Sequence, residues 1–83
     1  MNAGVSIVRC AGYEPSLVQK ALKGSLALLG GLTKFIKPES SVLVKPNLLM
    51  AVPAESGIDT HPEVVRAVLR LLKEIGCRIY VGD

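Results

Sequence analysis

The stretch from residue 42 to residue 62, VLVKPNLLMAVPAESGIDTHP, decides how the rest of the chain is interpreted. Three successive apolar residues, Val42 to Val44, predict a short strand over 41–45 with both faces covered, as in a parallel sheet. The end of the stretch predicts the start of a helix. Between them lies a loop of roughly fifteen residues, and loops of that length are uncommon in compact domains and are often functional. We therefore expect a ligand site to border this loop.

The helix after the loop has the clearest local signal in the chain. Thr60 and Glu63 have the spacing of a capping box, in which the Thr hydroxyl accepts from a backbone N–H and the Glu side chain reaches back. Pro62 fits the first helical turn, where its missing N–H has no helical partner. Gly76 suits the end of the helix. The predicted buried stripe consists of Val64, Val65, Val68, Leu71, Leu72 and Ile75.

Two further strands and one further helix are predicted outside this region. Residues 4–10 are rich in β-branched side chains and predict a first strand. A helix is expected from Pro15 to the Gly30-Gly31 pair, with Gly24 inside it. Glycine inside a helix costs about 1 kcal/mol relative to alanine, so we interpret Gly24 as a point of close approach to the sheet. Residues 77–81 predict the last strand.

The expected fold class is α/β, with the order β-α-β-α-β and a three-stranded parallel sheet. The 83 residues are enough for a single domain. With 49% hydrophobic residues, such a short chain has little interior in which to bury them. We therefore expect residues 1–83 to be the N-terminal portion of a longer protein, and a fragment of a larger doubly wound domain. Its surplus apolar surface would meet a second copy or a downstream domain.

Composition and charge argue against several function classes. The net charge of +3 comes from scattered Lys and Arg residues, and nucleic-acid sites usually cluster them, so no nucleic-acid partner is expected. Cys10 and Cys77 lack the spacing of a zinc or iron–sulfur site and are expected to be reduced thiols in a cytoplasmic protein. The longest apolar run, residues 26–32, is shorter than the roughly 18–20 residues of a membrane span, so no membrane partner is expected.

Polar residues gather where ligands bind in open parallel sheets, beyond the carboxyl ends of the strands. Lys45 and Asn47 follow the second strand, and Asp59, Thr60 and His61 precede the second helix. A helix N-terminus offers free backbone N–H groups to an anion, and Lys45 adds a full positive charge. These five residues predict a site for a small carboxylate or phosphate. Neither glycine-rich phosphate motif, GxGxxG or GxxxxGK[ST], is present.

Each of these residues also has a simpler interpretation. Thr60 is first a helix cap, Asn47 a turn residue and Lys45 a solvated strand end. His61 is either structural or an acid, a base or a metal ligand. A metal ion would need three or four ligands, which here means that His61, Asp59 and Asp83 would have to converge, so no metal site is predicted. Whether the protein is an enzyme stays open, and these residues alone are not expected to catalyse a reaction.

Two stretches together carry a family resemblance. VLVKPNLL, followed after the loop by THPEVVRAVLRLLKEIGCRIYVGD, resembles the N-terminal part of the uncharacterised "domain of unknown function" proteins that are often described as iron–sulfur cluster proteins. The resemblance covers most of the chain from residue 42 onward. Its matching positions are Lys45, Asn47, Thr60, His61, Pro62, Glu63, Gly82 and Asp83.

This resemblance implies a longer parent protein in which ferredoxin-type modules accompany the domain. An iron–sulfur cluster is expected only in such a parent, because this chain has no Cys-rich motif and is expected to carry no cofactor of its own. Two hypotheses for function follow. The first is a part of an iron–sulfur-associated protein that contributes to a small anion site. The alternative is a non-enzymatic interaction module that docks through open sheet edges and surplus aliphatic surface.

Overall fold

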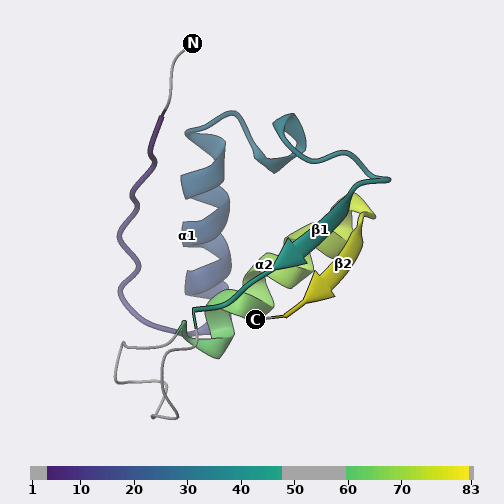
Figure 1. Ribbon diagram of the computed structural model, residues 1–83. Coiled ribbons are helices and arrows are strands. Elements are labelled where there is room, and N and C mark those ends of the chain that lie inside the picture. Colours follow the sequence, from purple (N-terminus) through teal and green to yellow (C-terminus); the bar gives the residue numbers. More distant parts are fainter. Residues whose placement is uncertain (1–3, 48–59, 83) are drawn as a thin grey trace.

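The computed structural model describes residues 4–47 and 60–82, and Figure 1 shows how the chain runs through them. Helices and strands alternate after the first third of the chain, as expected for the α/β class. The elements, in chain order, are helix α1 (Pro15–Ala27), the short 3-10 helix η1 (Leu32–Lys34), strand β1 (Ser41–Val44), helix α2 (Pro62–Ile75) and strand β2 (Arg78–Val81).

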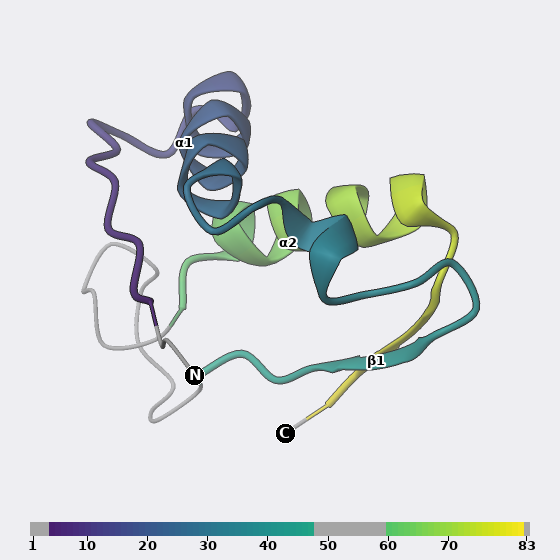
Figure 2. The ribbon, with the colours of Figure 1, turned by 90° about the horizontal axis from the view of Figure 1, so that it is seen from above.

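The two strands form a parallel pair, with Ser41 opposite Arg78 and Val44 opposite Val81. Helix α2 connects them, because parallel strands need a crossover that returns the chain to the same end of the sheet. Figure 2 shows both helices on the same side of the strands, so the described residues make two layers. The buried core lies between the helices and at the sheet-facing side of α2, and consists of Val18, Ala67, Leu71 and Leu72.

Helix α2 confirms the prediction made from its sequence. It runs from Pro62 to Ile75 and ends at Gly76, which has a left-handed φ of 87°. The Gly76 N–H donates to the carbonyls of Leu72 and Lys73, so the residue that ends the helix also satisfies two of its last carbonyls. The backbone angle at Gly76 is one that residues with a side chain rarely adopt.

Helix α1 is shorter than expected and ends at Ala27, before the glycine pair. Gly30 and Gly31 have φ values of 100° and 88°, and the Gly31 N–H donates to the Leu26 carbonyl at 2.8 Å, so the pair turns the chain after the helix has ended. The interpretation of Gly24 as a point of close approach is wrong for the described residues. Gly24 is exposed, and a Cβ built there would meet no described atom within 4 Å.

The predicted first strand differs from the structure. Residues 4–10 pair with no strand of the described residues, and the sheet there has two strands instead of three. The segment runs beside α1, away from β1 and β2 (Figure 1), where the Ser25 hydroxyl donates to the Ser6 hydroxyl at 3.1 Å. Val5 and Ile7 are each 88% exposed. Their β-branched side chains favour a strand, but a strand also needs a partner edge, and α1 offers none.

The prediction for the second strand is confirmed in position and corrected in burial. β1 lies over Ser41–Val44, but only Val42 and Val44 are half-buried toward α2. Leu43, on the other face, is 65% exposed. Three successive apolar residues therefore did not mean that both faces are covered within this part of the chain, because both helices pack on the same side.

No helix among the described residues is long and apolar enough to cross a membrane.

Candidate functional site

The carboxyl end of β1 and the start of α2 are joined by two reciprocal hydrogen bonds. The Asn47 N–H donates to the Thr60 hydroxyl oxygen at 2.9 Å, and the Thr60 N–H donates to the Asn47 carbonyl at 2.9 Å. These bonds join two residues that are far apart in sequence and hold the strand end beside the helix start. The prediction that the two ends of the long loop lie together is thereby confirmed for Asn47 and Thr60.

The residue that caps α2 is His61 and not Thr60. The His61 backbone is extended, with φ −64° and ψ 138°, and its Nδ1 accepts from the Glu63 N–H at 3.1 Å. The predicted capping box is therefore wrong at both positions. Thr60 uses its hydroxyl oxygen for Asn47, and the Glu63 side chain forms an ion pair with Arg66 rather than reaching back. The sequence spacing is compatible with either arrangement, so only the path of the incoming chain decides between them.

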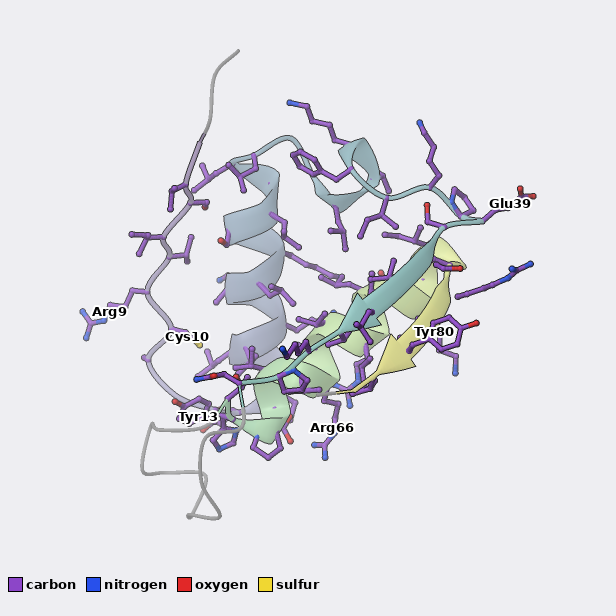
Figure 3. All side chains as sticks on the ribbon, viewed as in Figure 1. Arg9, Cys10, Tyr13, Glu39, Arg66 and Tyr80 are labelled. Atoms are coloured by element: carbon purple, nitrogen blue, oxygen red, sulfur yellow. The ribbon has the colours of Figure 1, made fainter. Side chains whose placement is uncertain are left out.

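His61 is also held by the segment before α1. The rings of Tyr13 and His61 stack, with centroids 3.7 Å apart and an interplanar angle of 5°. Figure 3 shows Tyr13 beside the first turn of α2. Because Nδ1 accepts the hydrogen bond that caps the helix, a neutral His61 ring carries its proton on Nε2. The stack and the cap together fix the plane of the imidazole, and they leave Nε2–H as its remaining donor.

The backbone donors at the start of α2 are already engaged. Pro62 has no N–H, and the Glu63 N–H is bound to His61 Nδ1. The N–H groups of Val64 and Val65 both donate to the His61 carbonyl, at 3.0 and 3.4 Å. The N–H groups of Glu63, Val64 and Val65 are therefore not free to bind an anion. An anion beside this turn of the helix has to be held mainly by side chains.

A hollow of about 340 Å³ lies beside the joined strand end and helix start. Its polar lining residues are Thr60 and Arg66, and its apolar lining residues are Pro46, Pro62, Val65 and Leu69. Arg66 is not among the site residues predicted from the sequence. The signal was its spacing, because Arg66 follows Pro62 by four positions and residues so spaced share one face of a helix.

Arg66 supplies the positive charge in this hollow, and Figure 3 shows it projecting from α2. Its guanidinium pairs with the Glu63 carboxylate one turn earlier, and the two side chains are 53% and 17% exposed. Such a pair on a helix surface contributes only about 0.3–0.5 kcal/mol. An incoming anion has to compete with the Glu63 carboxylate for the guanidinium.

The other expected site residues have different positions. Lys45 is exposed and does not line the hollow, whereas its neighbour Pro46 does. Since side chains alternate along an extended chain, Lys45 is directed to the opposite side of the sheet from Pro46. Asp59 and Asp83, which the sequence also singled out, lie outside the described residues.

The cysteines do not fit an iron–sulfur cluster, which is usually held by four thiolates. The Cys10 thiol, before α1, donates to the Gly12 carbonyl, and the Cys77 thiol, after α2, donates to the Leu72 carbonyl. Across residues 4–47 and 60–82, no three His, Cys, Asp or Glu side chains are grouped as metal ligands.

A parallel strand pair joined by a helix, with a hollow at the end of the first strand, defines this chain as an α/β protein. Comparison with protein families then specifies it further. Residues 42–83 match the family described as "Domain of unknown function (DUF362)", and the chain belongs to that family.

A curated relative is the thylakoid-associated protein sll1697 of Synechocystis sp.. It is 40% identical over 83 residues, which is 100% of this chain and 26% of the relative. The chain thus spans about a quarter of the length of the relative that it matches. No solved structure matches the chain.

Proposed function

We propose that this chain is the N-terminal α/β portion of a longer protein of its family and that it contributes to a site for a small anion, a carboxylate or phosphate. The site is the hollow beside Thr60 and Arg66. The observation that carries the proposal is the pair of hydrogen bonds between Asn47 and Thr60, because it holds the end of β1 against the start of α2 at the wall of that hollow.

Each polar side chain has a specific role in this proposal. The Thr60 oxygen accepts from Asn47, and within the described residues its own O–H is available to donate to a ligand. The Arg66 guanidinium is planar and matches a carboxylate or phosphate with two parallel N–H donors. His61 is a positioning residue, since its cap and its stack on Tyr13 set the direction in which α2 begins. Lys45, on the opposite side of the sheet, acts on the anion only through its long-range field.

The affinity should be weak, because the anion has to replace the Glu63 carboxylate on Arg66. We expect dissociation constants in the millimolar range for inorganic phosphate and acetate. Catalysis is not part of the proposal for these 83 residues.

The test is a titration of the chain with phosphate and with acetate, following the backbone amide signals of Thr60 and of residues 63–66 by NMR. Arg66→Ala should weaken binding at least tenfold. Arg70→Ala is the matched control, because Arg70 is an exposed arginine one turn further along α2 and does not line the hollow. Glu63→Gln should strengthen binding several-fold, and Lys45→Ala should change it less than twofold. Amide signals that stay unmoved at millimolar anion would refute the proposal.

The alternative function is a non-enzymatic interaction module, and exposed apolar side chains favour it. Leu43 and Tyr80 face each other across the two strands and are 65% and 58% exposed. Gel filtration with light scattering separates the two functions, because a specific oligomer of the chain favours docking and a monomer that binds phosphate favours the anion site.

Two further proposals concern the parent protein, namely its iron–sulfur association and its location in the cell. They rest on different observations. Its iron–sulfur association rests on the family resemblance, and the cluster ligands would lie in chain beyond this stretch. A cytoplasmic location rests on composition and reduced cysteines, whereas the name of the cyanobacterial relative favours association with thylakoids. Fractionation of cells that express the parent protein distinguishes the two locations.

A further inference from the structure

The outer face of the sheet, on the side away from the helices, has an apolar centre and basic ends. Side-chain alternation places Ser41 and Leu43 of β1 on this face, with Lys45 directly after the strand, and Arg78 and Tyr80 of β2 beside them. Figure 3 shows Tyr80 projecting from β2. Leu43 and Tyr80 are a cross-strand pair, so their side chains form one continuous patch.

Parallel sheets are rarely left open on one side. Strands joined by helical crossovers occur almost only with both faces covered, and here α1 and α2 cover the same face. Within residues 4–47 and 60–82, the face that carries the exposed Leu43–Tyr80 pair is therefore left uncovered.

The size of the patch argues against a second copy of this chain as the cover. Leu43 and Tyr80 expose on the order of 250 Å² together, whereas a stable dimer buries roughly 800 Å² on each partner. A segment of the same polypeptide can pack stably on a smaller area than a dimer partner, because the covalent chain already holds it close to the sheet. The cyanobacterial relative has room for one, since this chain matches only 26% of its length.

The charges define the chemistry of that segment. Among the described residues, the one ion pair joins Arg66 to Glu63. Neither Lys45 nor Arg78 therefore has an acidic partner within this part of the chain. Arg78 lies opposite Ser41 at one end of the face, and Lys45 lies four residues after Ser41, just past the other end of β1. Four strand residues span about 13 Å, which corresponds to about nine residues of an α-helix.

We propose that the outer face of the sheet is covered by an amphipathic helix from the part of the polypeptide that lies beyond this stretch in proteins of the relative's length. Its apolar stripe packs on Leu43 and Tyr80. It carries two acidic residues about nine positions apart, which pair with Arg78 and Lys45. This surface is separate from the anion hollow, so either proposal can fail without the other.

The test uses the full-length cyanobacterial relative, with the photo-crosslinking residue benzoylphenylalanine at the position that aligns with Tyr80. We expect an intramolecular crosslink to one helical peptide outside the matched stretch, with acidic residues at the predicted spacing. The position that aligns with Leu28 is the control, because Leu28 is 71% exposed at the end of α1 and does not lie on the sheet. Crosslinking there to the same peptide should be at least tenfold lower.

Three results would overturn the proposal. The first is a crosslink between two molecules, which would make a second copy the cover. The second is a crosslink to lipid, which would make the face a membrane contact. The third is the absence of any crosslink to a protein segment, both from the position aligned with Tyr80 and from the control position aligned with Leu28.

A companion measurement on the 83-residue chain uses the double variant Leu43→Lys with Tyr80→Lys. We expect the double variant to bind less of a dye for apolar surface, to unfold at a similar urea concentration and to keep its phosphate binding.

Discussion

Helices α1 and α2 share a starting proline and an apolar stripe but have different roles in the structure. Yet α2 buries three residues, packs against both α1 and β2, and is capped at both ends, whereas α1 buries only Val18 and has no side-chain cap at Glu14. The difference teaches that helical periodicity locates a helix but does not say how much of the fold depends on it.

The largest expected effect is at the centre of α2. Leu72 is 2% exposed, and Leu72→Ala should lower the free energy of unfolding by about 2–5 kcal/mol, because it removes buried methyl groups and leaves a cavity. The measurement is urea denaturation followed by circular dichroism. Val18→Ala on α1 is the matched variant, with an expected loss of about 1.5 kcal/mol. Equal losses of stability at the two positions would show that the fold depends on both helices to the same extent.

The next effect is at the start of α2. His61→Ala removes both the cap and the ring stacked on Tyr13, and should lower the free energy of unfolding by about 2 kcal/mol. His61→Asn retains a side-chain acceptor for the Glu63 N–H and loses only the stack, so about half of the stability should return. If both variants lose the same amount, the cap does not contribute and Tyr13 alone accounts for the effect.

A smaller effect of opposite sign is expected in α1. Gly24→Ala should raise the free energy of unfolding by about 0.5–1 kcal/mol, because alanine is the better helix former and the new Cβ has open space. Gly76→Ala is the contrasting variant at the end of α2, where the φ of 87° makes a side chain unfavourable, and it should destabilise the chain. Thermal unfolding measures both. A loss of stability on Gly24→Ala would mean that something packs against this face of α1.

The smallest effect concerns the ion pair on α2. Glu63→Gln should change the free energy of unfolding by no more than about 0.5 kcal/mol, because surface pairs one turn apart are weak. The same variant should strengthen phosphate binding several-fold. Stability and binding that fall together would show that Glu63 supports the fold and does not compete with the anion.

Much of the local structure could be predicted from sequence because its causes are local. The start of α2 at Pro62, its end at Gly76 and the positions of both strands follow from proline, glycine and apolar spacing near each element. The family match covers residues 42–83, the part of the chain that carries the resemblance noted in the sequence. Two of the residues singled out for the candidate site, Asn47 and Thr60, do lie together, whereas Arg66 was not singled out, because its spacing from Pro62 becomes informative only once the hollow is known.

What the sequence by itself determined is thus the α/β class, the two helices and the pairing of a strand end with a helix start. The tertiary structure alone decided that His61 rather than Thr60 caps α2, that Arg66 enters the hollow and that residues 4–10 lie beside α1 instead of in the sheet. The physical reason is the same in each case. A helix or a turn is specified by neighbours a few positions away. The Asn47 partner of Thr60, the Tyr13 ring stacked on His61 and the partner edge of a strand come instead from distant parts of the chain, which only folding brings within reach.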